Sequence, residues 1–286
     1  MNEEDFPSLY IDANETSIKT QVRFLLATKT VLIGSLIVSG LALTGTSKIG
    51  QIAQVVIAIF VLLSACYLLF GKPQTIWYST RALAESIKTI TWRFVMKADP
   101  FDVKDAEART KFRTAVSELL RANEEASALR YESAHTELIT KAMTTLRATN
   151  LDGRVSAYSN GRLEDQLDWY RRKSRWNDVR AKAWYGALIF FSILAIAVAF
   201  LRPFLDLQLP VDLAFSIPIA VLGWIQIKRF QELASSYGLT AHEITFAKND
   251  LAQAAGSEEK FQNFVGNTEN AFSREHTQWY ARKDLG

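Results

Sequence analysis

Cysteine, proline, glycine and histidine are all scarce in this chain of 286 residues. The single cysteine, Cys66, excludes an internal disulfide framework and a CxxC metal or redox site. The three histidines, His135, His242 and His276, are far apart in sequence and show no HExxH spacing. Six prolines and thirteen glycines favour long helices over a turn-rich β fold, and no alternating β pattern is sustained anywhere.

The net charge of the chain is also small. A formal charge of +3 excludes a general polyanion binder, so no nucleic-acid partner is expected. The first eighteen residues are acidic and polar, which does not resemble a cleavable signal peptide. A mean hydropathy near zero (+0.01) hides a division between very apolar and very charged stretches.

Four stretches lack charge and are rich in Leu, Ile, Val, Ala and Phe: 30–47, 49–71, 183–201 and 213–227. A membrane-spanning helix needs roughly 20 such residues. We therefore predict four spans in two hairpins, at about 25–47, 49–71, 183–201 and 209–227. The fourth is short and contains Pro218, which membrane helices tolerate as a kink; a buried core helix is the alternative.

Positive charge predicts the orientation of the hairpins. Lysine and arginine are dense on their open sides, whereas the tight turns hold only Lys48 and Arg202. Since cytoplasmic loops carry the excess of Lys and Arg, both termini and the long middle segment are expected in the cytoplasm.

The remaining sequence is predicted to be helical, giving an all-α membrane protein. We expect helices over 102–150, from near Gly161 into the third span, over 229–255 and from Glu258 to about Lys283. Asn150–Gly153 is expected to be a loop, and Ser159–Gly161 to start the next helix. The repeated hydropathy indicates an internal duplication: a first unit at 1–101, a helical connector at 102–160 and a second unit at 161–286.

Two helix faces outside the spans combine cations with indoles, at three- and four-residue spacing. Packing between helices explains most such faces; a ligand or partner site is the sharper hypothesis, because Arg and Trp suit phosphate recognition and protein interfaces. The first face consists of Trp77, Arg81, Glu85, Lys88 and Trp92; the second consists of Arg162, Gln166, Trp169, Lys173, Trp176 and Arg180.

Small and hydroxyl residues follow the first two spans, where they ordinarily allow close helix packing. A weakly polar pore lining, formed on assembly, is the alternative. No ionisable residue lies in mid-span, which argues against a proton-coupled transporter, and no catalytic constellation is found, so we expect no enzyme, no metal and no cofactor. The candidate pore-lining residues are Thr28, Ser35, Ser39, Thr46 and Gln54.

Three segments together resemble a known family. "WYSTRALAESIKTITWRFVMKADPF" resembles the segment after the hairpin of the SLATT domains, the two-transmembrane effectors that associate with SMODS nucleotidyltransferases and SLOG sensors. "RLEDQLDWYRRKSRWNDVRAKAWY" resembles the start of a second such domain. "ENAFSREHTQWYARK" is similar to the closing helix of the family, with the match carried by Glu269, Glu275, His276 and Trp279.

The resemblance implies a membrane effector of bacterial nucleotide-dependent antiphage defence. Such an effector would oligomerise and open a pore, or disrupt the inner membrane, when triggered. A separately encoded nucleotide-generating or sensor protein is then the expected partner, beside the lipid bilayer, and a nucleotide second messenger is the candidate ligand. The alternative is a membrane-anchored scaffold that senses a nucleotide or a partner and forms no pore.

Overall fold

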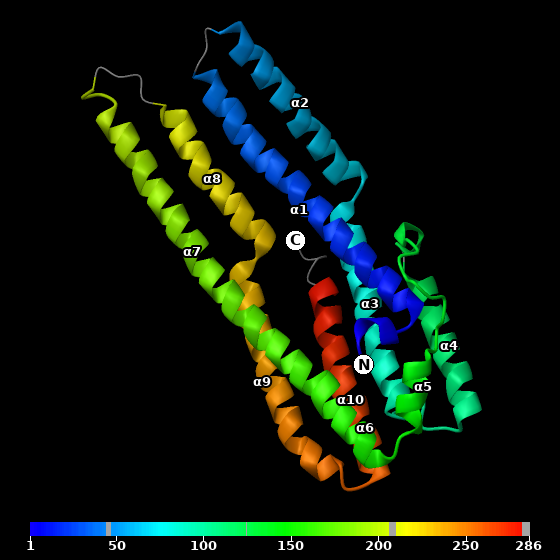
Figure 1. Ribbon diagram of the computed structural model, residues 1–286. Coiled ribbons are helices and arrows are strands. Elements are labelled where there is room, and N and C mark those ends of the chain that lie inside the picture. Colours follow the sequence, from blue (N-terminus) through cyan, green and yellow to red (C-terminus); the bar gives the residue numbers. More distant parts are fainter. Residues whose placement is uncertain (44–46, 124, 206–209, 282–286) are drawn as a thin grey trace. The chain divides into compact units, whose positions relative to one another are not determined.

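The computed structural model describes residues 1–43, 47–123, 125–205 and 210–281 of the chain, with side chains up to residue 272 (Figure 1). It is built from helices, and the described residues contain no strand, so the predicted all-α class is confirmed. The helices are η1 (Glu3–Asp5), α1 (Ser8–Ala42), α2 (Lys48–Phe70), α3 (Pro73–Val95), α4 (Asp105–Ala122), η2 (Ala126–Ala128), α5 (Lys141–Ala148), α6 (Leu151–Tyr158), the π-helix η3 (Ser159–Glu164), α7 (Asp165–Leu201), α8 (Val211–Lys228), α9 (Phe230–Ala254) and α10 (Glu258–Ala281).

The chain forms two compact units, and each unit draws on both halves of the sequence. One comprises Met1–Gln21, Gln74–Tyr170 and Leu239–Gly286, and we call it the extramembrane unit. The other comprises Val22–Pro73 and Arg171–Gly238 and holds the four apolar stretches; we call it the membrane unit.

Four helical segments are long and apolar enough, by length and composition, to cross a membrane. They are Ser8–Ala42, Lys48–Phe70, Leu151–Leu201 and Val211–Ala254. Pro218 lies inside α8 without ending it, as a membrane helix allows. The predicted set of four spans in two hairpins is confirmed.

Close backbone approaches hold the helices of the membrane unit together. A Cβ added at Gly34 of α1 would lie 2.6 Å from Val61 Cγ2 of α2, so only glycine allows this approach. Gln54 of α2 also donates from Nε2 to the Val38 carbonyl at 3.3 Å. The first hairpin is therefore joined both by packing and by a hydrogen bond that a membrane span needs to satisfy its polar group.

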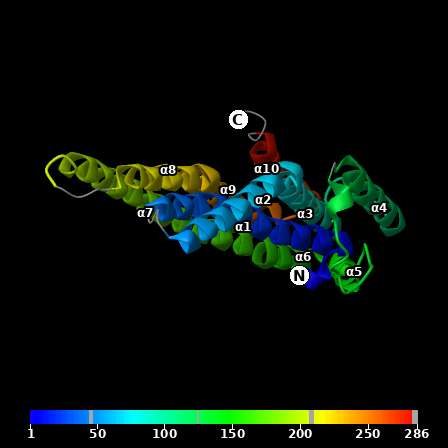
Figure 2. The ribbon, with the colours of Figure 1, turned by 90° about the horizontal axis from the view of Figure 1, so that it is seen from above.

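The second hairpin packs against the first through α8. The rings of Trp184 on α7 and Trp224 on α8 have centroids 6.3 Å apart. On the other side of α8, a Cβ added at Gly223 would lie 3.4 Å from Leu32 of α1. The four helices lie in the order α7, α8, α1 and α2 in Figure 1, and Figure 2 shows the same helices from above.

Each hairpin ends at one cationic residue in a left-handed conformation. Lys72, between α2 and α3, has φ 42°, and Arg229, between α8 and α9, has φ 47°. A non-glycine residue adopts this conformation at a cost of roughly 1–2 kcal/mol. The chain thus breaks in the same way after each hairpin.

Helix α3 supplies the centre of the core of the extramembrane unit. Its C-terminal turns bury Trp92, Phe94 and Val95 almost completely. The Phe94 ring packs on Phe112 of α4, with centroids 4.8 Å apart, and Trp92 meets Phe6 edge to face at 6.4 Å. Such aromatic pairs contribute beyond the area they bury, so α3 is fixed by α4 on one side and by the N-terminal segment on another.

Three local predictions are wrong. The helix predicted over 102–150 is interrupted between α4 and α5, where residues 129–140 are not helical. The predicted loop at 150–153 is instead the start of α6, because the Asn150 side chain accepts from Gly153 N at 3.0 Å and caps the helix. Ser159–Gly161 does not begin a helix either, since α6 continues through the π-helix η3 into α7.

Residues 129–140 form a strap along the first turns of α1. The buried Asp12 carboxylate accepts from the backbone N–H groups of Glu132 and Ser133, at 2.7 and 2.8 Å. Ser8 N donates to the Glu137 carbonyl at 2.9 Å, and Thr140 Oγ1 donates to the Asp5 carbonyl at 2.7 Å. These long-range partners satisfy backbone groups that would otherwise favour a helix, which explains why local propensity fails here.

Replacement of Asp12 by alanine is expected to release the strap. Two N–H donors lose a charged acceptor, so stability should fall by about 1–3 kcal/mol, and protease cleavage between Leu129 and Glu137 should accelerate. D12N keeps one acceptor oxygen and should fall between wild type and D12A. The control is K19A, which removes an exposed ion pair with Glu132 and should change stability by less than about 1 kcal/mol. Cleavage of D12A at the wild-type rate would contradict the assignment.

Candidate functional site

A buried ion pair joins α10 to the segment between α6 and α7. The Glu269 side chain is fully buried, and Arg162 of η3 is 2% exposed. Arg162 donates from Nε to Glu269 Oε1 at 2.8 Å and from Nη2 to Oε2 at 2.7 Å. Tyr158 OH donates to the same Oε1 at 3.0 Å. We call these three residues the Glu269 latch.

Charge pairing determines the protonation states in the latch. Burial disfavours the charge on Arg162, but the adjacent Glu269 carboxylate outweighs this effect and holds the pKa of Arg162 above its ordinary value. Burial and the same carboxylate both raise the pKa of Tyr158. The latch is therefore a guanidinium and a carboxylate joined by a bidentate contact, with a neutral phenol as third partner.

Aromatic rings enclose the latch. The Arg162 guanidinium lies 4.6 Å from the centre of the Phe272 ring, and Trp92 meets Tyr158 edge to face at 5.8 Å. Trp92 also packs against the turn at Gly161, where a Cβ would lie 3.4 Å from its Cη2, in ordinary van der Waals contact. The rings exclude water, which strengthens the ion pair and makes its loss costly.

Two donors in this enclosure have no partner. Trp92 Nε1 and Arg162 Nη1 are buried without a hydrogen-bond acceptor in the described part of the chain. An unmade buried hydrogen bond costs roughly 1–3 kcal/mol, and such groups are found where a site serves more than packing.

A second charged group lies along α3. Arg81 pairs with the buried Glu85 and donates from Nη1 to Asn14 Oδ1 of α1 at 2.9 Å. Burial lowers the pKa of Lys88, although the Glu85 carboxylate opposes that shift. Arg162 also acts on Lys88 electrostatically, so charges of α3 and η3 influence one another.

The predicted residues of the first face are thus largely enclosed. Glu85 and Trp92 are buried, and Trp77, Arg81 and Lys88 are half-buried. The second predicted face is divided: Arg162, Gln166 and Trp169 belong to the extramembrane unit, whereas Lys173, Trp176 and Arg180 belong to the membrane unit. Whether any of them binds a ligand stays a prediction.

The predicted pore-lining residues have different surroundings. Thr28 is buried, and Gln54 bonds to α1 as described above. Ser35 and Ser39 are exposed in the single chain and donate to the carbonyls of Val31 and Ser35 in their own helix, at 2.7 and 3.0 Å. Thr46 lies outside the described residues.

For the terminal motif, Glu269 is the buried acid of the latch. The side chains of Glu275, His276 and Trp279 lie outside the described part of the chain.

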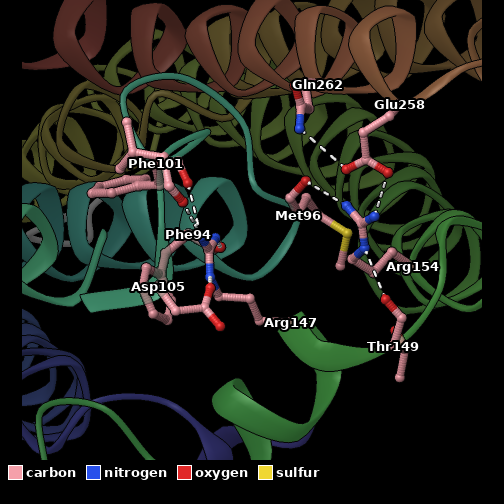
Figure 3. A network of polar contacts seen from close by, with 10 residues as sticks. Phe94, Met96, Phe101, Asp105, Arg147, Thr149, Arg154, Glu258 and Gln262 are labelled. Atoms are coloured by element: carbon pink, nitrogen blue, oxygen red, sulfur yellow. Dashed lines mark hydrogen bonds and ion pairs between the residues drawn. The ribbon is translucent and has the colours of Figure 1, made fainter. Parts of the chain in front are cut away.

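Sequence reasoning missed two buried arginines (Figure 3). Arg147 of α5 donates to the carbonyls of Phe94 at 2.5 Å and of Phe101 at 2.9 Å, and its Nε donates to Asp105 Oδ1 at 2.9 Å. Burial lowers the pKa of Arg147, with the hydrogen bond to Asp105 in opposition. Arg147 thereby ties the end of α3 to the start of α4.

Arg154 of α6 has a similar role toward α10. It donates from Nη1 to the Met96 carbonyl at 3.1 Å and from Nη2 to Glu258 Oε2 at 2.5 Å (Figure 3). Gln262 Nε2 donates to the other Glu258 oxygen at 3.1 Å. Arg154, Tyr158 and Arg162 are spaced four residues apart, which would have placed them on one face of a continuous helix. The loop predicted at 150–153 prevented that interpretation.

The fold and its contacts define a class: an all-α, multi-pass membrane protein with two hairpins in tandem and a polar, latched helical unit. Family comparison agrees with this class. The SMODS and SLOG-associating 2TM effector domain 3 (SLATT_3) matches residues 7–155, and the SMODS and SLOG-associating 2TM effector domain 1 (SLATT_1) matches residues 158–279. The chain therefore belongs to the SLATT family of membrane effector domains and carries two of them. No curated protein and no solved structure matches it.

The two acids of α10 that pair with arginine give a matched test of the latch. Glu269 is fully buried, whereas Glu258 is 44% exposed. E269Q leaves a buried guanidinium without its counter-charge and should lower the free energy of unfolding by about 3–5 kcal/mol. E258Q, the same change in the same helix, should lower it by about 1 kcal/mol or less, because Glu258 is open to water and Arg154 keeps its bonds to the Thr149 and Met96 carbonyls. Thermal unfolding in detergent measures both; equal losses would contradict a special role for Glu269.

Glu258 should also make stability depend on pH. The hydrogen bond from Arg154 holds the pKa of this carboxyl below its ordinary 4.5, despite some desolvation. The contribution of Glu258 to stability is therefore complete at a pH above the pKa of the unfolded state. It is lost as the pH falls through the lower pKa of the folded state. The difference in unfolding midpoint between wild type and E258Q should shrink from about pH 6 to about pH 3. A difference that stays constant over this range would contradict the ion pair.

Proposed function

We propose that this chain is the membrane-embedded effector of a bacterial, nucleotide-signal-dependent antiphage defence system. On triggering it oligomerises and opens a pore, or otherwise disrupts the inner membrane, with both termini in the cytoplasm. It acts without catalysis and without a cofactor. The membership of both halves in a family of 2TM effector domains supports this proposal.

The continuity of two helices carries the proposal furthest. Helix α1 runs without a break from Ser8 in the extramembrane unit to Ala42 in the membrane unit. Helix α7 does the same from Asp165 to Leu201, and η3 with Arg162 directly precedes it. A helix transmits rotation and translation along its axis, so a rearrangement at the latch would reach the first and third spans.

The exposed apolar surface of α2 supports the proposed oligomerisation. No residue of α2 is buried, and side chains such as Ile52, Phe60 and Leu63 are 58–64% exposed in the single chain. This surface suits lipid in a resting state and helices of further copies in an assembled one. Ser35 and Ser39, whose hydroxyls already bond to their own helix, could line a weakly polar passage without leaving unsatisfied groups in lipid.

The trigger in this proposal comes from a separately encoded nucleotide-generating or sensor protein. It would release α10 by weakening the contact between Glu269 and Arg162. If α10 exchanges between a latched and a released state, a ligand that binds the released state more tightly is enough to shift the equilibrium towards release.

A second candidate function rests on the unpartnered donors Trp92 Nε1 and Arg162 Nη1. A guanidinium N–H and an indole N–H suit the oxygens of a phosphate or a nucleobase. The chain would then be a membrane-anchored sensor of a nucleotide or a partner, without pore activity.

Membrane potential separates the two functions. Cells that carry the chain with its genomic neighbours should depolarise when phage infects them, as followed with a potential-sensitive dye. Without phage, E269Q should depolarise cells more than wild type, because its latch is weakened, while E258Q should behave as wild type.

The controls are equal membrane levels of the three proteins and retention of a single folded peak in detergent. Cells that survive infection with an unchanged potential would overturn the pore proposal and favour the sensing scaffold. E269Q that folds and leaves the resting potential unchanged would remove the latch from the mechanism.

A further inference from the structure

Cations from three helices gather around two indoles in the membrane unit. Lys29 Nζ of α1 lies 5.5 Å from the centre of the Trp224 ring, and Lys228 Nζ, at the end of α8, lies 5.9 Å from it. Arg180 Cζ of α7 lies 4.3 Å from the Trp176 ring. Trp176 in turn meets Phe230 edge to face, at 6.2 Å, and Lys228 lies 5.8 Å from the same Phe230 ring.

These cations repel one another. Besides burial, the fields of Lys29, Arg180 and Lys173 act on Lys228, and all three are positive. In the described part of the chain, no carboxylate forms an ion pair with Lys29, Arg180 or Lys228. The nearby acids are engaged elsewhere: Asp178 pairs with Lys182, and Glu232 pairs with Arg229.

Cation–π contacts offset only part of this repulsion. Each ring attracts a cation through its negative face, but Trp224 has to serve two ammonium groups. Like charges held together without a counter-charge are disfavoured unless an anion enters between them.

The sequence places the cluster at the level of lipid headgroups. Lys29 directly precedes the charge-free stretch 30–47, Lys228 directly follows the stretch 213–227, and Arg180 lies three residues before the stretch 183–201. Headgroup phosphates occupy the layer that borders the hydrocarbon, where Trp and Tyr are also enriched. Basic pockets between spanning helices are a recurrent way to bind anionic headgroups.

We infer that Lys29, Arg180 and Lys228, with the rings of Trp176 and Trp224, bind the phosphate of an anionic phospholipid. The ammonium and guanidinium groups donate to phosphate oxygens, and the indoles border the glycerol region. One lipid thereby links α1, α7 and α8, which belong to both hairpins. This inference does not depend on pore formation.

The test uses the full-length protein in neutral detergent, with added phosphatidylglycerol, phosphatidylcholine or inorganic phosphate. Phosphatidylglycerol should raise the thermal unfolding midpoint and phosphatidylcholine should not. R180Q/K228Q should weaken the apparent affinity for phosphatidylglycerol by at least about tenfold, the loss expected when two cations near a headgroup are removed.

The matched control is K182Q/R229Q. It removes two cations from neighbouring positions, but each of these cations has its own carboxylate partner. Its affinity for phosphatidylglycerol should remain within about twofold of wild type, less than the loss of one headgroup contact would cause. If R180Q/K228Q does not fold, K29Q, which removes the other ammonium group near the Trp224 ring, should show a smaller loss in the same assay.

Two results would overturn the inference. One is an equal loss in R180Q/K228Q and K182Q/R229Q, which would indicate general surface charge. The other is a full stabilisation by inorganic phosphate alone, which would indicate a site for a soluble phosphoryl anion instead of a lipid.

Discussion

A carboxylate and a guanidinium that are buried in the same core must form an ion pair, and this constraint organises the extramembrane unit. Glu269 is fully enclosed, and Arg162 and Tyr158 are the groups that satisfy it. A displacement of α10 by one residue would leave two charges buried without partners, at a cost of several kcal/mol. The pair therefore determines the register of α10 against η3 more strictly than apolar packing could, since apolar side chains tolerate small shifts.

The position of the pair in the chain gives it functional interest. Arg162 lies in a π-helix, which is a rare element that is frequent at functional sites, and this element continues directly into α7. Glu269 lies in the last helix, so the pair joins the beginning of the second SLATT domain to its end. The trigger that we propose would act by separating these two segments.

Periodicity was enough to predict the class of the fold, the four spans and the helices after each hairpin, because lipid demands long charge-free stretches. It failed at residues 129–140, where Asp12, more than a hundred residues away in sequence, accepts two backbone hydrogen bonds through Oδ1. It also predicted two separate cation–indole faces, yet the structure brings Trp92 of the first against Tyr158 and Gly161 beside Arg162 of the second. The buried roles of Arg147 and Arg154 were missed, since their partners are mostly backbone carbonyls, which no side-chain pattern reveals.

We propose that the Glu269 latch controls the membrane unit, and the chain contains its own reporter for this control. Cys66, the single cysteine, lies in α2 of that unit, so a water-soluble maleimide modifies one defined position. The most direct measurement compares its rate of modification in wild type, E258Q and E269Q, each embedded in lipid and selected for a folded peak. We expect a changed rate in E269Q alone, because a released latch alters how much water reaches α2. The same rate in all three proteins would contradict it.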